Sequence, residues 1–160
     1  MKYIDTSAFI KYYGNPEFEK GIDKIISLID KAKNGEEILI TSIFTIGEAI
    51  SAFDRWIRIK AISEEEFSKI ISRFFKDIEI LTTAGGLIIE SINSLSIVFS
   101  IDYIINHHIS INDCLHLYTA LTTQLSIIEF ISSDEMQLNA AKKEGFNIWN
   151  PEDNIDIAPH

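Results

Sequence analysis

Apolar residues are spaced in two ways along this chain, in short branched runs and in longer stretches with a period near 3.6. The short runs at residues 2–5, 37–41 and 127–131 are typical of buried strands, and 147–149 offers a last one. The periodic stretches between them are typical of amphipathic helices. Because strands alternate with helices over short turns, we predict an α/β fold: a three-layer α/β/α sandwich with a central parallel sheet.

Capping residues and helix stops set the predicted helix boundaries. Thr6 and Ser7 begin a helix directly after the first strand, and Ser63 with Glu66 has the spacing of a capping box. Gly145 follows the last predicted helix as its stop. The longer helices are expected at 17–34, 42–60, 63–76, 83–106, 110–123 and 134–143, with a further short strand at 78–81.

Composition places the chain among ordinary globular domains. Its 160 residues are 46% hydrophobic and 24% charged, which is enough to build a core without disulfides. We predict a single domain over residues 1–150 and a loosely ordered tail at 151–160. The single cysteine, Cys114, excludes a disulfide framework. Because no apolar run approaches the ~18 residues of a spanning helix and no signal peptide is recognised, we expect a cytoplasmic protein with no membrane partner.

The net charge of −10, from 14 basic and 24 acidic residues, argues against a nucleic-acid partner, because phosphates attract a basic surface. The total says little about position, however, since acids can cover solvated helix faces or gather where they bind cations. Four acids fall in matching places. Asp5 closes the first strand, Glu48 lies about two turns into the helix after the second, and Asp113 and Asp134 begin the last two long helices.

Taken singly, three of these acids need no function. Asp5, Asp113 and Asp134 lie at helix starts, where a carboxylate gains about 0.3–1 kcal/mol from the helix dipole and the free amides. Ser110 and Asp113 even have capping-box spacing. Glu48 is different, since it lies within a helix among apolar neighbours, and an unpaired buried carboxylate is costly. We therefore expect some partner to compensate Glu48.

Taken together, the four acids predict a metal site. Ligands of parallel α/β sheets bind at the carboxyl ends of the strands, the edge to which Asp5, Asp113 and Asp134 are delivered. Carboxylates that share a crevice repel unless cations neutralise them, and oxygen ligands suit Mg²⁺ or Mn²⁺. Two such ions about 4 Å apart can hold a phosphodiester and activate water. We therefore expect hydrolysis of a nucleic-acid backbone, at a site whose charge the bound ions reverse.

Four segments resemble the PIN-domain family, and together they span nearly the whole chain. They are Tyr3-Ile4-Asp5-Thr6-Ser7-Ala8-Phe9, Gly47-Glu48-Ala49, Ser110-Ile111-Asn112-Asp113-Cys114-Leu115-His116-Leu117, and Ile131-Ser132-Ser133-Asp134 with Ala140-Ala141 and Gly145-Phe146 beyond it. The resemblance implies a small α/β fold and a Mg²⁺- or Mn²⁺-dependent endoribonuclease. It also implies similarity to the VapC toxins of prokaryotic toxin–antitoxin pairs, and with it an RNA substrate, an antitoxin partner and a homodimer.

Carried over residue by residue, the resemblance implies that Asp5, Glu48 and Asp113 are the main metal-binding and catalytic acids. Asp134 would be the fourth, with the smaller role. The supporting residues that it implies, which would orient water or a ligand, are Thr6, Ser7 and Ser133.

Other chemistry-bearing residues are more simply explained by packing. His116 lies one turn after Asp113, but such a histidine is more often a hydrogen-bonded core residue than a metal ligand. Cys114 is expected to be a small buried hydrophobe, because no base is evident to activate its thiol. The densest basic group can approach a nucleic-acid backbone, although a solvated helix face with a packed tryptophan is the expected role. It consists of Arg55, Arg58 and Lys60, with Trp56 among them.

Two other functions compete with a nuclease. A PIN-like scaffold would bind a partner protein and cleave nothing, with its acids acting as caps or holding one structural ion. A phosphoacceptor receiver domain has a similar doubly wound sheet, but it would need a second acid beside Asp5 and a lysine late in the chain. No carboxylate is adjacent to Asp5 in the sequence, which makes the receiver domain the weakest of the three.

Overall fold

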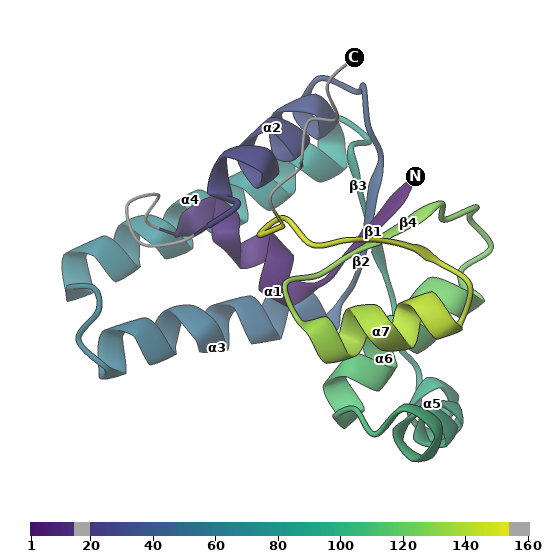
Figure 1. Ribbon diagram of the computed structural model, residues 1–160. Helices are drawn as coiled ribbons and strands as arrows, with labels where there is room; N and C mark the ends of the chain where they lie inside the picture. Colours follow the sequence, from purple (N-terminus) through teal and green to yellow (C-terminus); the bar gives the residue numbers. More distant parts are fainter. Residues whose placement is uncertain (15–19, 154–160) are drawn as a thin grey trace.

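A parallel sheet of five strands forms the centre of the protein. The computed structural model describes residues 1–14 and 20–153 (Figure 1). The strands are β1 (Lys2–Ile4), β2 (Leu39–Ser42), β3 (Leu87–Glu90), β4 (Glu129–Ile131) and β5 (Asn147–Trp149). They lie in the order β3-β2-β1-β4-β5, and every neighbouring pair is parallel. The predicted α/β class with a central parallel sheet is therefore confirmed.

Each face of the sheet has its own hydrophobic core, because successive strand residues point to opposite sides. Tyr3 of β1 is in register with Ile40 of β2 and Phe130 of β4, so these three side chains share a face. The opposite core contains Ile4, Leu39, Leu87 and Ile131. Both cores are closed by helices, which explains why the strands are apolar on both faces rather than alternating between apolar and polar.

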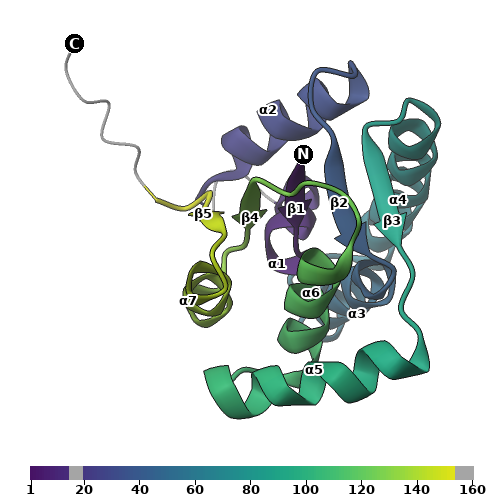
Figure 2. The same ribbon diagram turned by 90° about the vertical axis from the view of Figure 1, so that its right-hand side faces the viewer.

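The helices divide between the two faces and complete the predicted three layers. The described α-helices are α1 (Thr6–Phe9), α2 (Ile22–Lys33), α3 (Phe44–Arg58), α4 (Glu64–Thr83), α5 (Ser94–His107), α6 (Ile111–Thr122) and α7 (Glu135–Lys143), and a 3₁₀ turn at Ile10–Tyr13 extends α1. Buried residues of α1 to α4 pack in the core around Ile4, and those of α6 and α7 pack in the core around Tyr3, with α5 against them. Figures 1 and 2 show these two groups of helices on opposite sides of the strands.

The strand predicted at 78–81 is wrong, because this segment belongs to α4. The buried Phe74 and Leu81 lie seven residues apart on one helical stripe, so the helical period continues past Lys76, where an end was expected. The chain leaves the helix at Gly85, which has a φ of +73°. The strand that pairs with β2 lies further on, at Leu87–Glu90. The helix expected from residue 83 is α5, which begins at Ser94.

Other differences from the predicted elements are shifts of a few residues. The strand expected at 37–41 is Leu39–Ser42, and the one expected at 127–131 begins at Glu129. The helix expected at 17–34 is Ile22–Lys33, and residues 15–19 lie outside the described part of the chain.

The predicted tail at 151–160 is described only as far as Asp153. In this part, a carboxylate oxygen of Glu152 lies 2.8 Å from Lys11 Nζ, and the Glu152 N–H donates to Asn150 Oδ1 at 2.9 Å. Residues 154–160 lie outside the described residues. Across residues 1–14 and 20–153, no helix combines the length and apolar character needed to cross a membrane.

Candidate active site

Asp5 follows β1 directly and is only 2% exposed. It is the N-cap of α1, where its Oδ1 accepts the Ala8 N–H at 2.9 Å. The same carboxylate accepts the Ser7 hydroxyl at 2.9 Å and the Ser132 hydroxyl at 2.7 Å. Burial raises the pKa of Asp5 to about 6, although the nearby His116 and these hydrogen bonds act to lower it. A buried acid with a raised pKa at the carboxyl end of a central strand is a candidate functional group.

Three serines tie the end of β1 to the end of its neighbour, β4. Ser132 donates to Asp5 and accepts the Asp134 N–H at 2.9 Å through the same Oγ. Ser7 Oγ accepts the Ser133 N–H at 2.8 Å. The Ser133 hydroxyl is buried and has no hydrogen-bond partner within the described residues. The side chains that orient the Asp5 carboxylate are therefore those of Ser7 and Ser132, while Ser133 contributes through its backbone.

We expect Ser132→Ala to lower the free energy of unfolding by about 1–3 kcal/mol at pH 8, because it removes a hydrogen bond to an ionised buried carboxylate. The loss should be smaller at pH 4.5, where Asp5 is protonated in the folded state. Urea unfolding followed by circular dichroism at the two pH values measures the difference. Ser133→Ala is the matched control and should cost little, since its hydroxyl has no partner to lose. Equal losses in the two variants would show that Ser132 does not support Asp5.

Glu48 lies on the second turn of α3 and faces the start of α1. Its Oε2 accepts hydrogen bonds from the Thr6 hydroxyl and from His116, whose Nε2 lies 2.8 Å away. Burial acts to raise the pKa of Glu48, but these hydrogen bonds outweigh it, so that the pKa lies below its usual value. The compensation expected for Glu48 is therefore present, and it comes from α1 and α6.

His116 is a buried connecting residue, as the sequence predicted. An ionised Glu48 can only accept hydrogen bonds, so Nε2 of His116 carries the hydrogen of this contact. On its other side, Nδ1 lies 2.8 Å from the hydroxyl of Tyr3, the residue before Ile4 in β1. His116 thus links Glu48 on α3 to the central strand.

Asp113 and Asp134 have their carboxylates engaged in helix caps. Asp113 Oδ2 accepts the Ser110 hydroxyl at 2.7 Å and completes a capping box at the start of α6. Asp134 Oδ1 accepts the Met136 N–H at 2.7 Å and the Gln137 N–H at 3.0 Å at the start of α7. Gln137 also donates through Nε2 to the backbone carbonyl of Asp113 at 3.5 Å, so the two helix starts are neighbours. Asp113 and Asp134 therefore have the helix-capping role that the sequence analysis considered for them.

The backbone therefore brings the four predicted acids to one edge of the sheet, where Figure 1 shows α1, α6 and α7 close together below the strands. The side chains converge less than predicted. Asp5 and Glu48 lie on either side of His116 and Thr6, whereas Asp113 and Asp134 turn back to their own helices. Across residues 1–14 and 20–153, no group of three His, Cys, Asp or Glu side chains is arranged to hold a metal ion. The ligand role of the four acids stays a prediction.

Asp5 and Glu48 nevertheless fit one divalent cation by their chemistry. Mg²⁺ commonly binds to proteins through one or two carboxylates and completes its shell with water and substrate phosphate oxygens. Burial makes the ionised form of Asp5 costly and so raises its pKa. A nearby cation reduces this cost, because it favours the ionised form. Asp5 and Glu48 would therefore hold the ion, and a second ion held with Asp113 and Asp134 stays a prediction.

The fold and these residues agree with a comparison against protein families. The model of the PIN domain matches residues 2–143, which is most of the chain. The chain belongs to the PIN-domain family. PIN domains are generally nucleases that use divalent metal ions, so the family places this chain within a nuclease-type fold. No curated protein sequence matches significantly.

A solved structure supports the same fold assignment. The PIN domain described here is similar to PAE2754 from Pyrobaculum aerophilum, with a TM-score of 0.59 over 95% of this chain and 85% of that chain. The two sequences are 15% identical, so this similarity concerns the fold alone.

Sequence reasoning missed one important residue of this PIN domain, Ser132. The family resemblance implied Ser133 as a supporting residue and assigned no role to Ser132. The available signal was the period of two along the strand, which places Ser132 on the same face as Phe130. Ser132 also directly follows Ile131, which is paired in register with Ile4. Extending this register by one residue places Ser132 beside Asp5, which is where the 2.7 Å hydrogen bond is found.

Proposed function

We propose that this protein is a divalent-metal-dependent endoribonuclease that hydrolyses RNA phosphodiester bonds. The observation that carries the proposal is the buried Asp5, with a pKa of about 6 and with His116 nearby, at the carboxyl edge of a PIN-domain sheet. Thr6, the next residue in the chain, and His116 both hydrogen-bond to the ionised Glu48. Two hard oxygen donors are thereby held beside the N-termini of α1 and α6. The family supports the reaction class, because PIN domains are generally nucleases, and the assignment of these residues to the reaction is ours.

In this proposal each residue has a defined task. A bound Mg²⁺ or Mn²⁺ supplies charge neutralisation for the phosphate and activates water. Asp5 and Glu48 hold the ion, and Ser7 and Ser132 fix the rotamer of Asp5 through their hydroxyls. His116 and Thr6 keep Glu48 ionised and directed toward α1. Asp113 and Asp134 would add charged oxygen donors from the starts of α6 and α7.

The direct test is incubation of the purified protein with end-labelled single-stranded and structured RNA, with Mg²⁺, with Mn²⁺, or with a chelator. The proposal expects internal cuts that appear with the ions, disappear with the chelator and are lost in Asp5→Asn. Calorimetric titration of Mn²⁺ into the wild type and Asp5→Asn gives a second readout that does not depend on turnover. Cleavage that survives both the chelator and Asp5→Asn would come from a contaminating nuclease and would refute the proposal.

A second candidate function is a PIN-like scaffold that binds a partner and does not cleave. It is favoured by the caps of Asp113 and Asp134 and by the lack of a three-residue metal-binding group in the described part of the chain. A scaffold would bind Mn²⁺ weakly or not at all, and none of the RNA substrates would be cut. The raised pKa of Asp5 argues against it, because a scaffold gains nothing from burying a costly carboxylate.

Within the nuclease proposal, we further propose the toxin of a toxin–antitoxin pair that forms a homodimer. Support for association comes from α5, which has several exposed apolar side chains. Figure 2 shows this helix at the outside of the fold. The most exposed are Leu95, Val98, Phe99 and Ile105. Light scattering during size-exclusion chromatography measures the mass in solution, and a monomer at all concentrations would reject the homodimer. An adjoining frame for a small DNA-binding protein would support the toxin assignment.

A further inference from the structure

The outward face of α3 forms a stripe that begins at the candidate active site. Glu48, Ser51 and Arg55 are spaced by three and four residues, so their side chains follow one another on the same face of the helix. Arg58 and Ile59 continue that stripe to the end of α3. Seven residues separate Glu48 from Arg55, which corresponds to about 10 Å along the helix axis.

Two surface cavities follow this stripe and share Ser51 as a wall residue. The first, with a volume of about 680 Å³, is lined by Ile43, Phe44, Gly47, Glu48, Ser51 and Asn112. The second, of about 590 Å³, is lined by Ile10, Ser51, Ala52, Arg55, Trp56, Arg58 and Ile59. The two cavities therefore lie one after the other along α3, the first beside Glu48 and the second at a basic and aromatic end. We refer to these two cavities together as the α3 groove.

The charge of the α3 groove changes sign along its length. The sequence has three arginines, and two of them, Arg55 and Arg58, line its distal cavity. Arg55 is exposed and has no ion pair with any residue that the structure describes. Arg58 pairs with Asp54 at 2.8 Å, but both side chains are more than half exposed, so this pair is weak and can be exchanged for a phosphate. The third arginine, Arg73, is held against the rings of Tyr12 and Tyr13.

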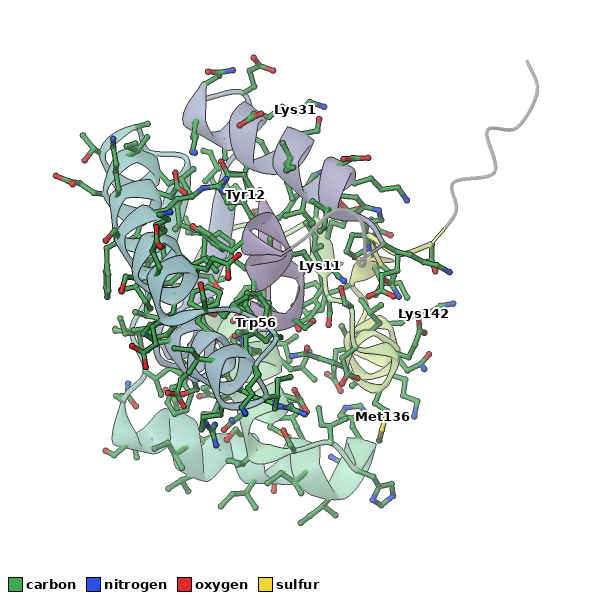
Figure 3. The ribbon with its side chains drawn as sticks, turned by 90° about the vertical axis from the view of Figure 1, so that its left-hand side faces the viewer. Lys11, Tyr12, Lys31, Trp56, Met136 and Lys142 are labelled. Atoms are coloured by element: carbon green, nitrogen blue, oxygen red, sulfur yellow. The ribbon has the colours of Figure 1, made fainter. Side chains whose placement is uncertain are left out.

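Trp56 adds an aromatic surface to the same cavity. It is half-buried and packs on Phe53, with ring centroids 5.2 Å apart, which fixes its orientation. Figure 3 labels Trp56 in the region where α3 lies next to the α1 segment. A fixed indole beside an unpaired arginine is the combination that binds single-stranded nucleic acid, because the cation contacts phosphate and the ring stacks on a base. A folded duplex offers no unstacked base to such a ring.

We propose that the α3 groove binds the single-stranded RNA next to the cleaved bond, with Arg55 on a backbone phosphate and Trp56 stacked on a base. The inference rests on the proposed function, because it uses Glu48 as the position of the scissile phosphate. Glu48 and Arg55 are separated by about 10 Å along the helix axis, which is short enough for one bound strand to reach both residues. The proposed groove also answers the objection that a net charge of −10 disfavours a nucleic-acid partner. Overall charge does not prevent local binding when two of the three arginines lie along one groove.

The test measures binding separately from cleavage. A fluorescein-labelled single-stranded RNA is titrated in Mg²⁺ with full-length Asp5→Asn protein, which leaves the RNA intact, and anisotropy gives the affinity. Adding Arg55→Ala should weaken binding about tenfold and reduce the slope of log affinity against log salt by about 0.7 to 1. Lys69→Ala is the matched control, because it removes the same charge from an exposed side chain of α4, and its effect should stay within about twofold.

A second measurement examines Trp56 itself. The protein has two tryptophans, so Trp149→Phe leaves Trp56 as the only one. RNA should quench the fluorescence of this variant, whereas Trp56→Phe, which retains Trp149, should show no quenching. If the wild type cleaves RNA but Arg55→Ala binds as tightly as Lys69→Ala and Trp56 is not quenched, the groove is refuted and the nuclease stands. If the wild type neither cleaves nor binds RNA, the nuclease proposal fails and the groove fails with it.

Discussion

Asp5→Asn should lower metal-dependent RNA cleavage by at least about 100-fold while leaving the protein folded, because it removes a charged oxygen donor and keeps the shape of the side chain. Gel-based initial rates with saturating Mg²⁺ or Mn²⁺ measure the change. The carboxamide keeps an oxygen that accepts the Ala8 N–H, so the cap of α1 persists. The cleavage rate is expected to reach the level of chelator-treated wild type.

The same substitution should make the metal-free protein more stable at high pH. The folded-state pKa of Asp5, about 6, lies above the ordinary aspartate value of 3.8, so the folded protein holds this proton more tightly than the unfolded chain. Stability contributed by the protonated acid is present below pH 4 and is lost as the pH rises through 6, a penalty on the order of 3 kcal/mol. Asp5→Asn cannot ionise and escapes this penalty.

The expected result is therefore a gain of about 1–3 kcal/mol in the free energy of unfolding at pH 8 and little gain at pH 4. Urea titrations in chelator at the two pH values measure it. Asp30→Asn, on the exposed side of α2, is the matched control and should change neither cleavage nor the pH dependence. Wild-type cleavage in Asp5→Asn would remove Asp5 from the site, and a loss of stability at pH 8 would show that its carboxylate is not strained by burial.

Glu48→Gln is expected to reduce cleavage by about 100-fold or more, because Glu48 is the second carboxylate proposed to hold the ion. The glutamine oxygen can still accept hydrogen bonds from Thr6 and His116, so the hydrogen bonds that join α1, α3 and α6 can still form. The Mn²⁺ affinity measured by calorimetry should fall together with the cleavage rate, since the lost group is a proposed ligand.

The effect of Glu48→Gln on stability should have the opposite sign to that of Asp5→Asn. The pKa of Glu48 lies below its usual value, so its ionised form stabilises the fold above the unfolded pKa, and this contribution is lost as the pH falls through the folded pKa. Thermal unfolding in chelator at pH 8 should therefore show a small decrease for Glu48→Gln. Glu79→Gln, exposed on α4, serves as the control for loss of one negative charge. A stabilised Glu48→Gln would mean that His116 and Thr6 do not compensate Glu48.

The helix boundaries show where local sequence signals suffice and where they do not. The capping boxes at Ser63–Glu66 and Ser110–Asp113 are formed as predicted, because both depend on contacts within one turn. The error at 78–81 arose because a short apolar run suits a strand and a buried helix equally well. Only the packing of Phe74 and Leu81 in the shared core decides that this run continues α4.

The candidate site shows the same division. Asp5, Asp113 and Asp134 were recognised as cap positions from their neighbours in the sequence, and all three form those caps. The need of Glu48 for a partner followed from its apolar surroundings. Its partners, Thr6 and His116, lie 42 and 68 residues away, and no local pattern identifies them.

The sequence by itself determined the alternation of strands and helices, the parallel sheet, and the delivery of acidic residues to helix starts near strand ends, because these follow from hydrophobic period and from hydrogen bonds within a few residues. Tertiary structure alone decided which acids face one another. The pairing of β1 with β2 and β4 buries Asp5 beside Ser132 and brings Glu48 to His116, whereas Asp113 and Asp134 keep their local donors. Burial and partners set the pKa and direction of a carboxylate, and both depend on residues distant in the chain.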